Sequence, residues 1–329
     1  MSSPQIGVLG LGNFGTALAH HLGSIGNQVV AWDRDTAVID ELLTSGRHPK
    51  VFSDVTISEN VRFEANLEAL AETPTLLVAI AASALENFLP TIAHFNTKLV
   101  ISAVKGFATE HETPLSLLNR ILPADVQTAV LSGPGFARDL IHGTPIGIVA
   151  GSKDEAIAKQ VAQMFSGGSL RVYASADPLG VELGGILKNV VAIAVGISDG
   201  YGFGDSARAF LITRGLSEMI RIATHLGATE KTLFGLSGLG DLVLTATCDA
   251  SRNRSLGLAL GKGNKLEQAL EQIGSTTEGV RTARLLVDLA NENAIEMPII
   301  ACLVEILDGK IDPKETLKKL LSRNLKTEF

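Results

Sequence analysis

The sequence predicts two domains of different class: a doubly wound α/β domain over residues 1–177 and an all-helical domain over residues 178–329. In the first part, short apolar runs alternate with helical patterns, and these runs have the length of buried strands. After residue 178 the alternation stops, and the periodic segments have helical spacing. A chain of 329 residues is long enough for two domains of ordinary size.

Composition limits the class of protein. Hydrophobic residues make up 46% of the chain and the net charge is −7, which is typical of a folded protein and gives no support to a nucleic-acid surface. Cys248 and Cys302 have neither disulfide nor metal-ligand spacing, so we expect no metal and a reducing, cytoplasmic compartment. The N-terminus lacks the basic region of a signal peptide. The most apolar run, Leu183–Ile197, is too short and interrupted to cross a bilayer, so we predict a buried core helix and no membrane insertion.

The same patterns predict the individual elements. Buried strands are expected at Gln5–Leu9, Gln28–Trp32, Thr75–Ile80, Lys98–Ser102, Ala129–Leu131 and Ile146–Val149. Helices of the second domain are expected at about 180–198, 206–226, 251–261, 265–272, 278–293 and 297–308.

A glycine-rich loop follows the first predicted strand. Gly10, Gly12 and Gly15 open a helical pattern, and Asp33 follows about twenty residues later, as a dinucleotide-binding Rossmann site requires. The glycines allow a pyrophosphate to approach a helix N-terminus closely. Asp33 would accept a hydrogen bond from a ribose hydroxyl of NAD, whereas Arg34 would form an ion pair with the 2′-phosphate of NADP. The sequence therefore predicts NAD(P) and does not decide between the two cofactors. The similar string at Gly238–Leu242 has no strand before it and is not read as a phosphate loop.

One lysine lies in the middle of the most apolar run. Burial disfavours the charged form of Lys188 and makes its amine a usable base at neutral pH. Gly184, Gly185 and Ala192 stand one turn away, so the helix face beside the lysine is nearly bare and leaves room for a ligand. The alternative is a lysine that extends over small residues to reach water. Asp241 lies within an otherwise uncharged run and needs a partner, for which Lys188 would serve.

Two further groups of polar residues are candidates for binding an anion. Ser251 is a candidate helix N-cap, and the amides of that helix start with Arg252 would make a phosphate cradle. The alternative is a capped helix with solvated arginines. Lys105 follows a predicted strand and precedes Gly106, where a charged group for substrate is plausible, although an isolated lysine is usually solvated.

Taken together, these motifs resemble the NAD(P)-dependent glycerol-3-phosphate dehydrogenases of the bacterial type. The resemblance covers nearly the whole chain and is carried by residues 182–190, 199–205, 209–216, 238–245 and 251–254, with 10–15, 105–106, 131–134, 278–280 and 296–298 in the expected order. It implies a Rossmann domain followed by a helical domain like that of 6-phosphogluconate dehydrogenase. It also implies hydride transfer between sn-glycerol 3-phosphate and dihydroxyacetone phosphate, which supplies glycerol 3-phosphate for glycerophospholipid synthesis in the cytoplasm. The apolar helical domain, for its part, favours a homodimer.

The resemblance also assigns roles by position. Lys188 resembles the proton acceptor, and the catalytic set it implies is Lys188, Lys105 and Asp241. The implied substrate-binding residues are Lys105, Gly133, Gly135, Lys188, Asn189, Asp241, Ser251, Arg252 and Asn253. The implied cofactor-binding residues are Gly10, Gly12, Asn13, Phe14, Gly15, Asp33, Arg34, Lys105, Ala137, Arg252, Thr276 and Glu278.

The chain departs from the family pattern at several positions. Gly135 stands where the family usually has Ser or Thr, so a hydroxyl contact to the substrate is expected to be missing. Asp33 replaces a small or neutral residue, Ser206 replaces Asn, and the loop Arg47–Val55 lacks the usual Tyr-Leu-Pro-Gly character. Two other functions remain open at this point: a 3-hydroxy-acid dehydrogenase of the same two-domain build, and a non-catalytic NAD(P) sensor that has kept the Rossmann half.

Overall fold

The computed structural model describes residues 5–110, 112–274, 278–312 and 315–316. The chain forms two compact units, residues 1–182 and 183–329. The first is an α/β unit and the second is helical, which confirms the predicted fold class.

The first unit is built on one eight-stranded sheet with the order β3-β2-β1-β4-β5-β6-β7-β8. All neighbouring strands pair in parallel except β6 and β7, which are antiparallel. The strands are β1 (Gln5–Leu9), β2 (Gln28–Trp32), β3 (Val61–Glu64), β4 (Thr75–Val78), β5 (Leu99–Ser102), β6 (Gln127–Ser132), β7 (Ile146–Gly151) and β8 (Leu170–Ser175).

Helices cover both faces of this sheet, and each face has its own apolar core. Side chains alternate along a strand, so Ile6 and Val8 of β1 pack into one core while Leu9 packs into the other. The first core includes residues of α1 (Asn13–Ser24), α2 (Thr36–Ser45), α5 (Ala137–Ile141) and α6 (Glu155–Phe165). The second includes residues of α3 (Leu85–Phe88) and α4 (Pro114–Ile121). This doubly wound arrangement places ligands at the carboxyl ends of the strands.

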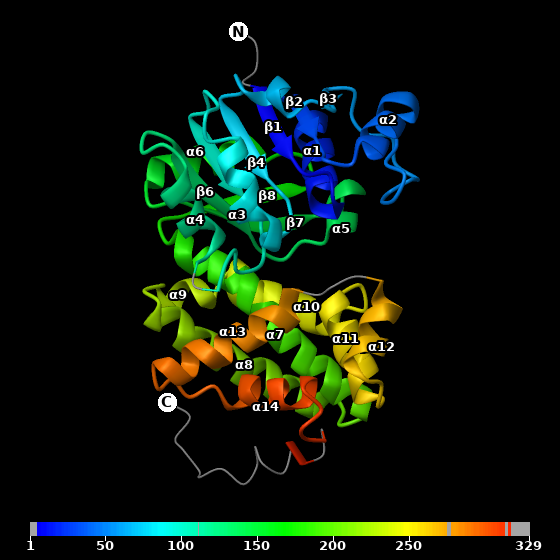
Figure 1. Cartoon of the computed structure of the whole chain (residues 1–329), viewed down its shortest axis with the longest axis vertical. Helices are drawn as coiled ribbons and strands as arrows, with labels where there is room; N and C mark the ends of the chain where they lie inside the picture. Colours follow the sequence, from blue (N-terminus) through cyan, green and yellow to red (C-terminus); the bar gives the residue numbers. More distant parts are fainter. Residues whose placement is uncertain (1–4, 111, 275–277, 313–314, 317–329) are drawn as a thin grey trace. The chain divides into compact units, whose positions relative to one another are not determined.

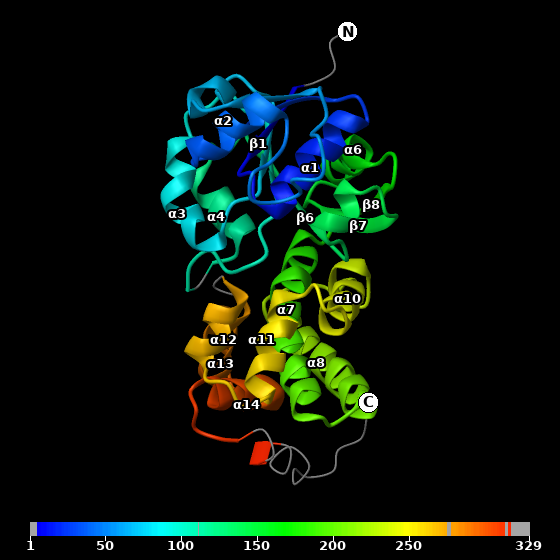
Figure 2. The ribbon, with the colours of Figure 1, turned by 90° about the vertical axis from the view of Figure 1, so that its right-hand side faces the viewer.

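The second unit consists of helices packed around α7 (Pro178–Tyr201), which begins in the first unit (Figure 2). The others are α8 (Asp205–His225), α9 (Glu230–Leu233), α10 (Asp241–Thr247), α11 (Arg252–Gly261), α12 (Leu266–Ile273), α13 (Glu278–Glu292) and α14 (Pro298–Leu307), with a π-helix at Leu236–Gly240. The predicted helices match α7, α8 and α11 to α14 within a few residues, whereas α9, α10 and the π-helix were not predicted.

Helix α7 corrects one step of the sequence argument. With 24 residues it is long and apolar enough to cross a membrane by length and composition alone, so it is not too short as expected. However, 94% of its most apolar window is buried within the protein, which is typical of the core helix of a soluble protein. Among the described residues, one bent pair, Glu230–Thr247 with Arg252–Gly261, passes the same test when it is counted as one span.

A buried glutamate joins the first turn of α7 to the start of α4. The backbone N–H of Leu115 donates to Oε1 of Glu182 at 2.8 Å, and Thr113 caps α4 beside it. Burial raises the pKa of Glu182 to about 7, and the hydrogen bonds from Thr113 and Leu115 only partly oppose this shift. Glu182 therefore favours its neutral form in the folded chain.

This raised pKa predicts a pH-dependent difference between the wild-type chain and Glu182→Gln. The contribution of neutral Glu182 to stability is complete below its ordinary pKa of 4.5 and is lost as the pH rises to about 7. Glutamine stays neutral and keeps an acceptor for the N–H of Leu115. The free energy of unfolding of the variant minus that of the wild type should therefore increase by roughly 3 kcal/mol as the pH rises across this range. Urea unfolding of both proteins at the two ends of this pH range measures this difference in the free energy of unfolding. A difference that stays constant with pH would contradict this assignment.

Candidate active site

Lys188 is buried in the middle of α7, with 6% of its surface exposed. Its Nζ donates one hydrogen bond to Oδ1 of Asp241, at 2.5 Å, and another to Oγ1 of Thr245, at 2.9 Å. The predicted partner of Asp241 is therefore confirmed, and the alternative in which the lysine reaches bulk water is not observed. Sequence reasoning missed Thr245, which lies one turn after Asp241 on the same face of α10 and contacts it at 3.5 Å.

The glycine strip beside Lys188 is partly filled by the chain itself. A Cβ added at Gly184 would lie 2.4 Å from the backbone oxygen of Ser237, because the π-helix lies directly against α7 at this point. The expected empty strip is therefore wrong at Gly184. The glycine serves instead to bring the π-helix close, and that segment leads straight into Asp241 at the first position of α10. Single π-turns of this kind are common at functional sites.

Asp241 and Lys188 form a desolvated ion pair. Asp241 is 1% exposed, and the side chain of Lys188 is 8% exposed. A buried charge requires such a partner, and removing either one leaves the other uncompensated. The pair therefore holds the lysine amine in one position within the helical unit.

The start of α11 lies against the same helix. Ser251 is the N-cap, as predicted, and its hydroxyl accepts from the backbone N–H of Arg254 at 3.2 Å. Nδ2 of Asn253 donates to Oδ1 of Asn189 at 3.0 Å, one residue after Lys188. Arg252, the first residue of α11, is exposed. Within the described residues, Oδ1 of Asn253 is buried and has no hydrogen-bond partner.

Helices α7 and α11 cross at backbone contact. A Cβ at Gly257 would lie 2.1 Å from the carbonyl oxygen of Ile193, and one at Gly196 would lie 2.2 Å from that of Arg254. Gly200 and Gly261 repeat this arrangement one turn further along. The four glycines therefore set the distance between the helix of Lys188 and the helix of Arg252.

The glycine loop of the first unit has the geometry of a dinucleotide site. Gly10 has φ of +98°, which favours glycine, and a Cβ at Gly15 would lie 2.0 Å from the carbonyl oxygen of Gly10. Around Gly12 no described atom outside its own neighbours lies within 4 Å of an added Cβ, so the loop is open where a pyrophosphate would approach. Asn13 and Phe14 are the first residues of α1, so the loop ends at a helix N-terminus. These residues fit a dinucleotide.

Asp33 has a structural role in addition to the predicted one. Its Oδ2 accepts from the backbone N–H of Leu11 at 2.6 Å, and its Oδ1 accepts from that of Asp35 at 2.9 Å. The carboxylate therefore fixes the glycine loop to the end of β2. Arg34 is exposed beside it.

His48 is a second support of the glycine loop, and sequence reasoning missed it. Its Nδ1 accepts from the backbone N–H groups of Lys50 and Val51 at 3.1 and 3.2 Å, so the proton lies on Nε2, which donates to the carbonyl of Leu11 at 2.9 Å. Burial lowers the pKa of His48, which favours this neutral form. His48 belongs to the segment 47–55, which is one of the expected departures from the resemblance.

Lys105 lies at the carboxyl edge of the sheet, half-buried beyond the end of β5. Its Nζ donates to the carbonyl of Gly133 at 3.1 Å and lies 5.6 Å from the ring centroid of Phe14. The structure thus brings together three residues predicted for the site from three separate parts of the first unit. The alternative of a fully solvated lysine is not observed.

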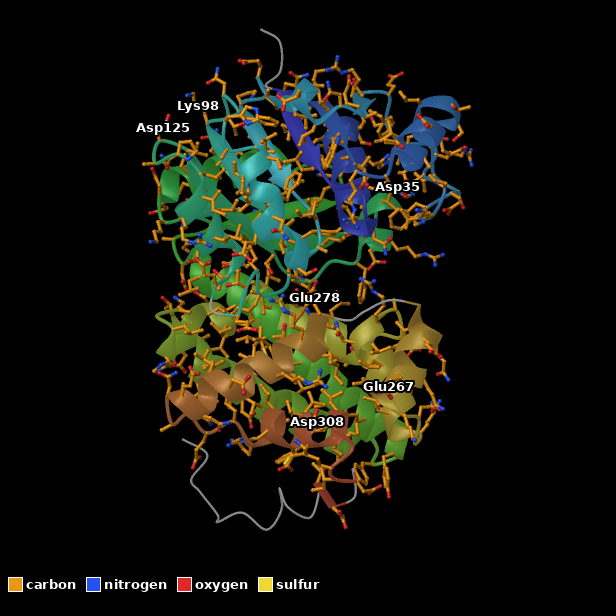
Figure 3. All side chains as sticks on the ribbon, in the orientation of Figure 1. Asp35, Lys98, Asp125, Glu267, Glu278 and Asp308 are labelled. Atoms are coloured by element: carbon orange, nitrogen blue, oxygen red, sulfur yellow. The ribbon has the colours of Figure 1, made fainter. Side chains whose placement is uncertain are left out.

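Gly135 has a physical reason to be glycine. A Cβ at this position would lie 2.9 Å from Cγ2 of Ile146, so serine or threonine would require a shift of that side chain. Ala137, another predicted cofactor residue, begins α5 and is partly buried against the core. Glu278 is the first residue of α13 (Figure 3), and Thr276 lies outside the described residues.

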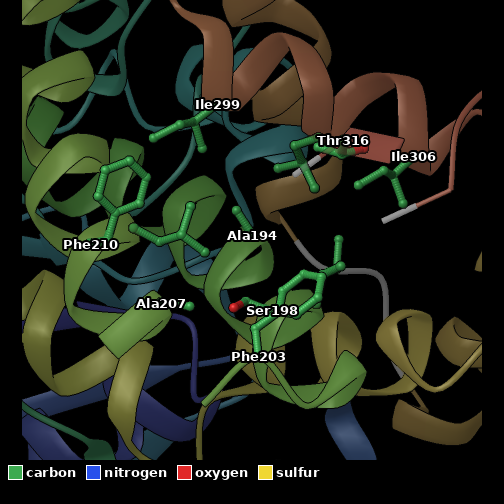
Figure 4. A pocket seen from close by; sticks show the side chains of 11 residues that line it. Ala194, Ser198, Phe203, Ala207, Phe210, Ile299, Ile306 and Thr316 are labelled. Atoms are coloured by element: carbon green, nitrogen blue, oxygen red, sulfur yellow. The ribbon is translucent and has the colours of Figure 1, made fainter. Parts of the chain in front are cut away.

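The helical unit also contains a separate apolar pocket of about 70 Å³ (Figure 4). Its walls come from α7, α8, the connection between them, and α14 with the segment that follows. Nearly all the side chains are aliphatic or aromatic, including Ala194, Phe203, Phe210 and Ile299. Among its described lining residues none is charged, so this pocket does not suit a phosphate.

The comparisons with known proteins agree over both units. The sequence profile of the NAD-dependent glycerol-3-phosphate dehydrogenase N-terminus matches residues 5–158, and the profile of the C-terminus matches residues 177–318. The chain is 42% identical to the glycerol-3-phosphate dehydrogenase [NAD(P)+] of Thioalkalivibrio sulfidiphilus over the full length of both chains. It is 41% identical to that of Syntrophotalea carbinolica over 99% of each chain.

The chain belongs to the NAD-dependent glycerol-3-phosphate dehydrogenase family. A solved member agrees in structure as well as in sequence: the glycerol-3-phosphate dehydrogenase of Coxiella burnetii has 35% identity and a TM-score of 0.91, with 98% of this chain and 99% of that chain covered. The family is one of NAD(P)-dependent oxidoreductases, as the resemblance implied. The 3-hydroxy-acid dehydrogenase and the non-catalytic sensor are not favoured. The roles of individual residues stay predictions.

Proposed function

We propose that this member of the family interconverts sn-glycerol 3-phosphate and dihydroxyacetone phosphate with NAD or NADP. The observation that supports this most directly is the buried pair of Lys188 and Asp241 in a chain whose relatives carry that activity in their names. An amine held at one point beside a carboxylate is suited to moving a proton to and from a substrate hydroxyl.

In the proposed reaction, oxidation removes the proton from the C2 hydroxyl and a hydride from C2. Lys188, as a neutral amine, takes the hydroxyl proton, and as an ammonium ion it returns that proton and polarises the ketone in reduction. Asp241 and Thr245 orient the amine. When bound, a reduced dinucleotide would supply the hydride for reduction, and an oxidised one would accept it in oxidation.

We assign substrate binding to the domain 178–329, with contributions from the first. Arg252 and the start of α11 hold the phosphate, since an exposed guanidinium and helix amides suit that anion. The amide of Asn253 binds Asn189, the residue after Lys188, and is a further proposed substrate contact. The remaining proposed contacts are Lys105, Gly133, Gly135, Lys188, Asn189, Asp241 and Ser251.

We assign cofactor binding to the domain 1–177. The glycine loop would hold the pyrophosphate, and Asp33 and Arg34 lie where the ribose is bound in this fold. The other proposed contacts are Asn13, Phe14, Lys105, Ala137, Arg252, Thr276 and Glu278. The wider setting that we propose is a cytoplasmic homodimer that supplies glycerol 3-phosphate to glycerophospholipid synthesis without inserting into a membrane or binding nucleic acid.

A steady-state assay tests this function. The purified chain should oxidise NADH or NADPH when dihydroxyacetone phosphate is present, and should do so far more slowly with unphosphorylated dihydroxyacetone, because the phosphate contacts position the reacting carbon. Comparing NADH with NADPH also decides the cofactor preference. Turnover of 3-keto acids without turnover of the phosphate ester would contradict the proposal and favour the hydroxy-acid alternative.

A further inference from the structure

The two arginines of the segment Ser251–Arg254 have different surroundings. Arg252 is exposed, whereas the side chain of Arg254 is only 9% exposed. Nε and Nη2 of Arg254 both donate to Oδ2 of Asp199, at 3.2 and 2.8 Å, and its Nη1 donates to Asp249. The guanidinium of Arg254 is therefore committed to contacts within the protein.

Asp199 is the buried member of this group. Its side chain is 4% exposed near the end of α7, and its two oxygens also accept from Nε of Arg208 on α8 at 3.0 and 3.1 Å. One carboxylate thus connects α7 to both α11 and α8. Arg208 differs from Arg254 in being 30% exposed, and each of the two arginines also binds a second, exposed aspartate, Asp205 and Asp249 respectively.

The pair of Asp199 and Arg254 holds the first turn of α11, the part of that helix at which the substrate phosphate is proposed to bind. Arg254 lies two residues after Arg252, in the first turn of α11. The glycine crossing sets how close α11 lies to α7, and Nδ2 of Asn253 adds a neutral hydrogen bond to Asn189 across the same contact. A guanidinium with two nitrogens on one carboxylate adds a charged, directional contact to these, because its donors form a rigid planar fork.

We propose that Asp199 and Arg254 are positioning residues for the phosphate site: they hold the first turn of α11 so that Arg252 faces the phosphate of the substrate. This inference rests on the proposed function, and it assigns a task to two residues that are not among the proposed substrate and cofactor contacts. It also explains why the segment carries two arginines, of which one binds the ligand and the other holds the helix.

The test is Arg254→Lys, with Arg208→Lys as the matched control on the same carboxylate. Lysine keeps the charge beside Asp199 but loses the fork geometry. For Arg254→Lys we expect the KM for dihydroxyacetone phosphate to rise by about tenfold, the scale of losing one charged hydrogen bond. The KM for the reduced dinucleotide should stay within about twofold of the wild type. The preference for the phosphate ester over dihydroxyacetone should fall in parallel, whereas a general structural fault would lower both activities together. Arg208→Lys should change these values much less.

If Arg254→Lys does not fold, the double variant Asp199→Asn with Arg254→Gln replaces the charged pair by a neutral one. It should show the same rise in KM and the same loss of phosphate preference. A folded variant that keeps the wild-type KM and preference would overturn this inference. A wild-type chain without activity on dihydroxyacetone phosphate would instead overturn the proposed function, so the two failures are distinguishable.

Discussion

Replacing Lys188 by alanine should lower kcat by at least about a hundredfold, the usual scale for losing a group that transfers a proton. In this structure the amine is the buried group that Asp241 and Thr245 hold in place, at 2.5 and 2.9 Å. Steady-state kcat with dihydroxyacetone phosphate, alongside the dissociation constant of the reduced dinucleotide, measures the effect.

This variant needs a folding control, because alanine leaves the charge of Asp241 buried without its lysine, at a cost of about 3–5 kcal/mol. The double variant Lys188→Ala with Asp241→Asn removes both charges and should recover much of the stability without recovering kcat. Adding a small primary amine to Lys188→Ala should restore part of the activity if the missing group is the amine itself. Near-normal turnover in a folded variant that binds cofactor would exclude Lys188 from the proton transfer.

Replacing Gly257 by alanine should destabilise the helical unit by about 3 kcal/mol or more. The added Cβ would lie 2.1 Å from the carbonyl oxygen of Ile193 and 2.8 Å from Cα of Gly196, and backbone atoms cannot turn aside as a side chain can. Helix propensity alone favours alanine over glycine by up to about 1 kcal/mol. The sign of the change in the free energy of unfolding therefore shows whether the steric clash or the helix propensity dominates. Urea unfolding gives the free energy of unfolding.

Ser255→Ala, two residues earlier on α11, is the matched control and should change stability by less than about 0.5 kcal/mol. In Gly257→Ala the KM for dihydroxyacetone phosphate should also rise, because α11 must move away from α7 and carry Arg252 with it. A variant as stable as the wild type would show that the helices can separate there without cost.

The pairing at the candidate site was predictable for a simple reason. Lys188 and Asp241 are each isolated charges in apolar stretches, and an isolated buried charge needs a partner, so two such residues in one domain select each other. The N-cap at Ser251 was predictable because capping depends on local sequence. Fold class followed from the change in periodicity near residue 178.

Other parts were not predictable because they depend on contacts between distant segments. Strand β8 has alternating exposed residues at the edge of the sheet, and β3 is short, so neither resembles a buried strand. The π-helix at Leu236–Gly240 is rich in glycine and reads as a loop until its packing against Gly184 is known. Nothing in the sequence marks His48 as the partner of Leu11, 37 residues away.

The two hydrogen bonds of Asp33 have a consequence for anyone who wishes to redesign coenzyme preference. Exchanging this aspartate for a smaller neutral residue would remove both hydrogen bonds that hold the glycine loop to the end of β2, so we expect the affinity for either coenzyme to fall, whatever happens to the preference between them. Substituting Arg34, which is exposed beside it, would leave both hydrogen bonds of Asp33 in place.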